Sequence, residues 1–80
     1  MPKSIYTPKY KHLRALLIEA RKRAGLSQTE LAERLGHVQT YVSKYERGER
    51  RLDIVEFFEL AAALQIDPFR FLRRLFPPHE

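Results

Sequence analysis

The most chemically informative stretch of the sequence is QTYVSKYERG, residues 39–48, in which polar side chains recur at helical spacing. A helical wheel of about 100° per residue places one amide, two hydroxyls and two cations within about 140° of one another. Amides and hydroxyls can pair with the edges of nucleic-acid bases, and cations can pair with bases or phosphates. This polar stripe consists of Gln39, Thr40, Ser43, Lys44 and Arg47.

The opposite side of the same stretch is aromatic and apolar. Tyr41, Val42 and Tyr45 fall there, with Glu46 at the border. This division is typical of a helix that packs on one side and offers the other to a partner. The stretch therefore predicts a helix over 39–47, packed through its aromatic side.

The preceding segment contains a start signal and a stop signal for a second helix. Ser27 and Glu30 have the spacing of a capping box, and Gly36 can adopt the positive φ that a turn requires. The segment therefore predicts a helix over 28–35. Because only about two residues then separate it from the next helix, the two helices are expected to meet at a steep angle.

Three further helices are predicted to support this pair. Thr7 before Pro8 and Asp67 before Pro68 are helix starts, and apolar residues recur at helical spacing after each. The sequence thus predicts an all-α fold, a compact five-helix bundle. The expected helices span 8–24, 28–35, 39–47, 54–65 and 68–76, in one domain of residues 1–80 whose residues 1–7 form a flexible arm.

The last two helices are unusually apolar. The segment 54–65 is apolar nearly all round, with only Glu56, Glu59 and Ala63 left to face water, and we expect it to be the central buried helix. The final helix carries more apolar surface than one small core needs. Its rings either pack inside the monomer or form a dimer interface, for which the candidates are Phe69, Leu72 and Phe76.

Charge is distributed unevenly along the chain. The net charge is +5, but residues 1–51 hold 12 Lys and Arg against 5 Asp and Glu, whereas residues 52–80 hold 3 against 5. The basic part favours a polyanionic partner, and the acidic remainder favours packing or a protein partner.

Several classes of function are excluded by what the sequence lacks. No apolar run approaches the roughly 18 residues of a membrane span, and no signal-peptide region is present, so we expect a cytoplasmic protein. There is no cysteine, and His12, His37 and His79 lack metal-ligand spacing. We therefore expect no metal, no cofactor and no enzymatic activity.

Two runs, GLSQTELAERLG at 25–36 and QTYVSKYERGERRLD at 39–53, carry a resemblance to a known family. Residues 13–66 resemble the Xre/Cro-type helix-turn-helix domain of phage repressors and small bacterial regulators. The resemblance implies a lambda-repressor-like fold whose second and third helices form the helix-turn-helix. It departs at His37, usually aliphatic, and at Val38, usually Ser, Thr or Pro, so we expect the third helix to begin without a side-chain cap.

The resemblance also implies roles for individual residues. Gln28 matches the position that usually contacts a phosphate and braces the start of the recognition helix. Other positions match or adjoin those that reach base edges or the phosphate backbone. The implied base contacts are Gln39, Thr40, Ser43 and Lys44, and the implied backbone contacts are Gln28, Arg47, Arg50 and Arg51. Tyr41 borders the polar stripe, and we expect its hydroxyl to reach the backbone as well.

Together these features predict a sequence-specific double-stranded DNA-binding transcriptional regulator of bacterial or phage type. The expected mode is a repressor that binds an inverted repeat as a homodimer. The alternative is a helix-turn-helix protein-interaction module or an antitoxin that acts chiefly through an unknown protein partner. The intact polar stripe favours DNA binding, and salt-dependent binding to duplexes distinguishes the two.

Overall fold

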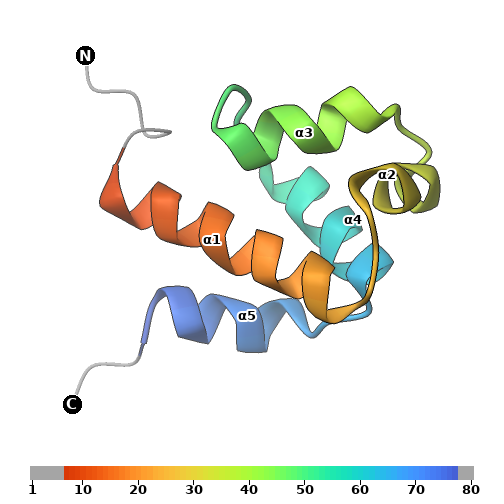
Figure 1. Ribbon diagram of the computed structural model, residues 1–80. Helices are drawn as coiled ribbons and strands as arrows, with labels where there is room; N and C mark the ends of the chain where they lie inside the picture. The colour runs from red at the N-terminus through yellow and green to blue at the C-terminus, as the bar shows by residue number, and fades with distance from the viewer. Residues whose placement is uncertain (1–6, 78–80) are drawn as a thin grey trace.

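The computed structural model describes residues 7–77, and over that range the chain forms five helices and no strand, which confirms the predicted all-α class. In Figure 1 the first and fifth helices run side by side, the third lies above them, and the second and fourth close the far end. The predicted arm lies, apart from Thr7, outside the described residues. The helices are α1 (Pro8–Arg23), α2 (Gln28–Leu35), α3 (Gln39–Arg47), α4 (Ile54–Leu64) and α5 (Pro68–Leu75).

Three helices end one residue before their predicted ends, for local backbone reasons. α1 stops at Arg23, two residues before Gly25, which adopts a left-handed conformation with φ 73°. α4 stops at Leu64 because Gln65 itself adopts a left-handed conformation with φ 58°. α5 stops at Leu75 because Phe76, with φ −126° and ψ 80°, has left the helical region.

The helix starts follow the predicted capping chemistry. The Thr7 side chain accepts a hydrogen bond from the Tyr10 N–H at 3.1 Å, one turn into α1. In the capping box of α2, Ser27 Oγ accepts from the Glu30 N–H at 3.0 Å and Glu30 Oε1 accepts from the Ser27 N–H at 2.8 Å. These bonds satisfy N–H groups that have no partner inside their own helix.

The connection between α2 and α3 turns the chain sharply. Gly36 ends α2 with φ 72°, and the His37 N–H then bonds back to the Ala32 carbonyl at 2.9 Å. Figure 1 looks almost down the axis of α2 while α3 runs across the view, so the two helices meet at the steep angle that the short connection predicted.

The core is built from all five helices. Leu17, Leu31, Val42, Tyr45 and Leu60 are the largest fully buried side chains, and they come from the first four helices. α5 completes the core with Phe71 and Leu75. None of the described helices is long and apolar enough to cross a membrane.

The prediction that α4 is buried all round was wrong. Ile54 is 65% exposed and Val55 61% exposed, and Phe58 is also exposed. Only the side of α4 that carries residues such as Phe57 and Leu60 meets the rest of the core, because none of the other helices in residues 7–77 covers the opposite side. Apolar composition alone does not require burial.

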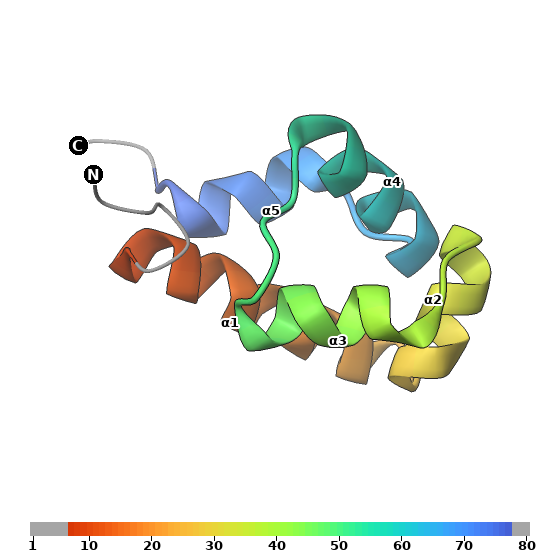
Figure 2. The same ribbon diagram turned by 90° about the horizontal axis from the view of Figure 1, so that it is seen from above.

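α1 and α5 are joined along their length as well as through the core. Lys9 Nζ, in the first turn of α1, donates to the Leu75 carbonyl at the end of α5 at 2.6 Å. The same ammonium lies 4.5 Å from the centre of the Phe76 ring. Both views show the two helices adjacent (Figures 1 and 2).

Candidate nucleic-acid interface

Three members of the predicted polar stripe lie on the exposed side of α3. Gln39, Thr40 and Lys44 are all exposed to solvent. Among the residues that the structure describes, the Thr40 and Lys44 side chains make no hydrogen bond or ion pair. Their hydroxyl and ammonium groups are therefore available to an external partner.

Ser43 does not share this exposed surface, although the helical wheel placed it within the stripe. It is only 8% exposed, and its Oγ accepts a hydrogen bond from Arg47 Nη1, one turn later in α3. Ser43 therefore holds the Arg47 guanidinium rather than offering its own hydroxyl at the surface.

A chain of hydrogen bonds fixes the first residue of α3. Gln39 Nε2 donates to Gln28 Oε1 at 2.7 Å, and Gln28 Nε2 donates to Glu46 Oε1 at 2.9 Å. The Glu46 carboxylate is bound by Arg21 of α1 through Nε at 2.7 Å and Nη2 at 3.1 Å. This network of Arg21, Glu46, Gln28 and Gln39 connects α1, α2 and α3, and it gives Gln28 the bracing role that was predicted from resemblance.

The buried part of this network is an ion pair that the sequence analysis missed. The Arg21 and Glu46 side chains are only 12% and 5% exposed. Arg21 also donates to the Leu26 carbonyl at 2.9 Å, and Arg14 donates to the Glu46 carbonyl at 3.2 Å. The signal available in the sequence was that a glutamate bordered the buried side of α3, but its partner lies 25 residues away.

Arg47 is held at the surface by an ion pair with Glu49. Its Nε and Nη2 each lie 3.0 Å from a carboxylate oxygen of Glu49. The hydrogen bond from Arg47 lowers the pKa of the Glu49 carboxyl. The ion pair fixes the plane of the Arg47 guanidinium, which is exposed at the C-terminal end of α3.

Tyr41 of α3 and Arg50 of the following loop belong to a stack of side chains that also includes His37. The Tyr41 ring stacks on the His37 ring with centres 4.0 Å apart, and the Arg50 guanidinium lies 4.7 Å from the centre of the Tyr41 ring. Glu56 binds Arg50 at 2.6 and 3.1 Å, and this hydrogen bonding lowers the pKa of the Glu56 carboxyl. Arg51, the next residue in the loop, is exposed. The basic loop after α3 is therefore ordered by contacts within the chain.

The start of α3 lacks a side-chain cap, as predicted. Val38 occupies the N-cap position with the extended backbone typical of a cap, but its side chain makes no capping hydrogen bond and is 70% exposed. The end of α3 is regular: Gly48 adopts φ 80° and its N–H bonds back to Tyr45 O at 3.2 Å.

The three residues predicted for a dimer interface are not equally placed. Phe69 and Phe76 are exposed, whereas Leu72 is half-buried against the core. The Phe69 ring lies 5.9 Å from that of Phe58 on α4. Phe69 therefore extends an exposed surface that the sequence analysis had assigned to the core. This α4–α5 apolar face consists of Ile54, Val55, Phe58, Ala62 and Phe69.

Comparison with known families agrees with the geometry of α2 and α3. A family model described as helix-turn-helix matches residues 17–71, which include the C-terminal part of α1, all of α2, α3 and α4, and the start of α5. The chain belongs to the Xre-type helix-turn-helix family. Members of this family are regulators rather than enzymes, which confirms the prediction that this chain is not an enzyme. Residues 7–77 contain no cluster of His, Asp and Glu that could hold a metal ion.

Two solved structures are similar to this helix-turn-helix chain. An XRE-family like protein from Pseudomonas syringae pv. tomato str. DC3000 is 46% identical, with a TM-score of 0.82, over 88% of each chain. The restriction-modification controller protein C.AhdI from Aeromonas hydrophila is 38% identical, with a TM-score of 0.69, over 75% of this chain and 87% of that one.

A curated relative is similar over a shorter region. The uncharacterized HTH-type transcriptional regulator y4dJ of Sinorhizobium fredii (strain NBRC 101917 / NGR234) is 41% identical over 46 residues. The match covers 58% of this chain and 60% of the relative. The similarity therefore extends to less than two thirds of that regulator's length.

Proposed function

We propose that this protein is a transcriptional regulator that binds double-stranded DNA in a sequence-specific manner. The observation that carries the proposal is the exposed set Gln39, Thr40 and Lys44 on α3, with Gln39 positioned by Gln28. The similarity to y4dJ, an HTH-type transcriptional regulator, and to C.AhdI, a restriction-modification controller protein, supports it. Bacterial sources of all three relatives support a role in bacteria.

The proposed recognition places α3 in the major groove and α2 across the phosphate backbone. Gln39 uses one amide N–H to bind Gln28, which leaves its carbonyl oxygen and second N–H for an adenine edge. Lys44 donates to guanine acceptors, and Thr40 donates to a base or offers its methyl group to thymine.

Contacts to the DNA phosphate backbone are assigned to the side chains that surround the base-contacting residues of α3. Gln28 lies at the start of α2, and Arg47 at the end of α3 is held by Ser43 and Glu49. Arg50 and Tyr41 are ordered by their mutual contact. We propose that these groups contact phosphates together with Arg51, and that Ser43 acts by positioning Arg47 rather than by touching a base.

We further propose that the regulator is a repressor that binds an inverted repeat as a homodimer. The α4–α5 apolar face supports this, because a contiguous exposed apolar surface on a small chain marks an interaction site. Phe69 keeps its predicted place in the interface, and α4 adds Val55 and Phe58. Two recognition helices in successive major grooves require half-sites separated by about 34 Å.

Selection of bound duplexes from a random pool tests the specificity. Gln39→Ala is expected to weaken binding to the selected duplex by about 1–3 kcal/mol and to relax the preference at one base pair. Arg73→Ala, an exposed cation on α5, is the control and should leave specificity unchanged. An equal loss on selected and random duplexes would assign Gln39 a positioning role only.

Sedimentation equilibrium tests the dimer. Val55→Asp should shift the protein to a monomer without loss of helical circular dichroism, because Val55 is exposed in the single chain. A wild-type protein that stays monomeric on its operator would contradict the homodimer.

The second candidate is a protein-interaction module or antitoxin, and one observation favours it. The α4–α5 apolar face also suits a different protein partner. Salt dependence separates the candidates: phosphate contacts lower the logarithm of the binding constant with a slope of about −0.9 per neutralised phosphate. Absence of salt-sensitive binding to every duplex in the pool would favour the interaction module.

A further inference from the structure

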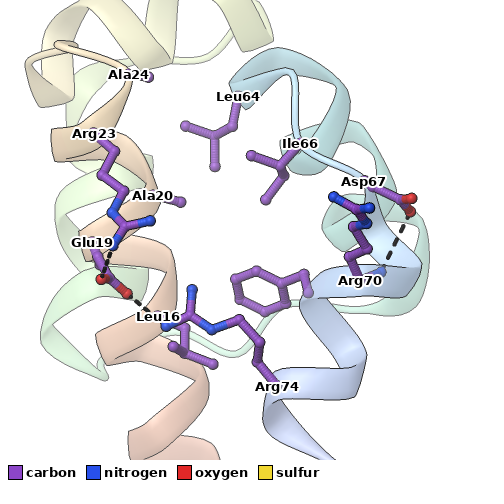
Figure 3. A pocket seen from close by; sticks show the side chains of 11 residues that line it. Leu16, Glu19, Ala20, Arg23, Ala24, Leu64, Ile66, Asp67, Arg70 and Arg74 are labelled. Atoms are coloured by element: carbon purple, nitrogen blue, oxygen red, sulfur yellow. Dashed lines mark hydrogen bonds and ion pairs between the residues drawn. The ribbon is translucent and has the colours of Figure 1, made fainter.

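A cleft of about 400 Å³ lies between the C-terminal half of α1 and α5, closed at one end by the segment that connects α4 to α5 (Figure 3). Its volume lies within the range of small-molecule sites, roughly 300–1,000 Å³. No residue of α2 or α3 lines it, so an occupant would leave the proposed DNA-binding surface free.

The floor of the cleft is apolar. Leu16 and Ala20 of α1 face Leu64 and Ile66 across it (Figure 3), and Phe71 of α5 also lines it. All five belong to the hydrophobic core or pack against it. The floor is therefore a fixed apolar surface of the folded chain, and Phe71 contributes an aromatic side chain to it.

The rim of the cleft combines three cations with two acids that are already engaged. Glu19 binds both Arg23, at 3.2 Å, and Arg74, at 3.1 Å. Asp67 caps α5 by accepting from the backbone N–H groups of Phe69 and Arg70. The Glu19 carboxylate thus pairs with two guanidinium groups. Because three arginines face two acids, the rim carries a net positive charge.

The Arg70 guanidinium stands out on this rim. It makes no ion pair with any residue in the described part of the chain, and it lies beside Ile66 at the edge of the cleft (Figure 3). Arg74 extends across the mouth from α5 toward Glu19 of α1. Two guanidinium groups on one helix, four residues apart, therefore flank an apolar floor.

We propose that this α1–α5 cleft binds a small aromatic carboxylic acid. The ring system lies on the floor against Phe71, Leu64 and Ile66, and the carboxylate accepts hydrogen bonds from Arg70 and Arg74. A carboxylate matches the planar, two-pronged donor geometry of a guanidinium group. The α4–α5 apolar face does not suit such a ligand, because Ile54, Val55, Phe58, Glu59 and Ala62 line its hollow without a cation.

The test uses 2-naphthoate and its uncharged isostere 2-naphthamide, titrated into ¹⁵N-labelled protein. The carboxylate is expected to give saturable shifts at the amides of Ala20, Ile66 and Phe71 and to bind about tenfold more tightly than the amide. Equal affinities for the two compounds, or shifts confined to the α4–α5 apolar face, would overturn the proposal.

Two variants of α5 separate the cleft from general electrostatic attraction. Arg70→Ala should remove most of the preference for 2-naphthoate over 2-naphthamide, and Arg73→Ala, which deletes an equal charge outside the cleft, should preserve it. Both residues are exposed, and thermal unfolding without ligand verifies that the variants fold. The same weakening by both substitutions, or by neither, contradicts the assignment of Arg70.

Discussion

α2 and α3, the two helices of the helix-turn-helix, begin in different ways. α2 starts at a capping box in which Ser27 and Glu30 exchange hydrogen bonds of 3.0 and 2.8 Å. α3 starts at Val38, whose side chain caps nothing. The first residue of α3 is held instead by Gln28, a residue of α2 that is itself bound to Glu46.

The start of α2 is therefore fixed by residues close to it in the sequence, and the start of α3 is fixed by contacts with other helices. The bonds that begin α2 join residues three apart, so α2 can be specified before the fold forms. The bonds that fix Gln39 at the start of α3 come from α2 and, through Glu46, from α1, so this side chain takes its place only in the complete bundle. The helix assigned to the DNA partner is thus the one that depends more on the rest of the chain.

The strongest test of this dependence is Glu46→Ala. Removing the carboxylate leaves Arg21 largely buried without its charge partner, and the expected loss is about 3 kcal/mol of unfolding free energy. Urea denaturation followed by circular dichroism measures it. Glu33→Ala, at an exposed acid of α2, is the control, with an expected change within about 0.5 kcal/mol. Similar losses for the two variants would show that packing alone holds α3.

The glycines that end the two helices give a paired comparison. Gly48→Ala should cost about 2 kcal/mol, because a left-handed alanine is strained and its Cβ would lie 2.5 Å from Arg14 Nη1. Gly36→Ala has the same backbone strain but open space around the new methyl, and about 1 kcal/mol is expected. Thermal and urea unfolding compare the two. Equal losses would show that Arg14 moves aside without cost.

Removing the cap of α2 has a smaller expected effect. Ser27→Ala deletes the hydroxyl that accepts from the Glu30 N–H and should lower stability by about 1 kcal/mol. Thr29→Ala removes an exposed hydroxyl in the same turn and should change little. If Ser27→Ala proved neutral in urea denaturation, α2 would resemble α3 in its reliance on the bundle.

Adding a cap to α3 should have the smallest effect and the opposite sign. Val38 has the extended backbone of an N-cap and is mostly exposed, so Val38→Ser gains a capping oxygen and loses little packing. The expected gain is about 0.5 kcal/mol in the same denaturation experiment. A decrease in stability would show that the valine side chain contributes to the turn through packing.

The sequence predicted the parts of the fold that depend on neighbouring residues. Thr7, Ser27 and Gly36 mark helix ends through bonds within one or two turns, and the structure confirms these ends. The absence of a cap at Val38 was predicted in the same way. Such signals are complete within a few residues and need no knowledge of the tertiary fold.

The errors arose where burial depends on distant segments. A helical wheel assigned Ser43 to the open side of α3 because it ignores how Arg47 folds back over the hydroxyl. Apolar composition assigned Ile54 and Val55 to the core, although no helix covers them. The ion pair of Arg21 and Glu46 joins residues 25 apart, and only the packing of α1 on α3 brings them together.

The hydrogen bond between Gln39 and Gln28 has an entropic consequence for recognition. A free glutamine on a helix surface samples many rotamers, and holding such a side chain at an interface costs about 0.5–1.5 kcal/mol. Gln39 is already restrained before any partner arrives, through a series of bonds that reaches the buried Glu46. The chain therefore presents a preorganised amide, and part of the ordering cost of binding is met during folding.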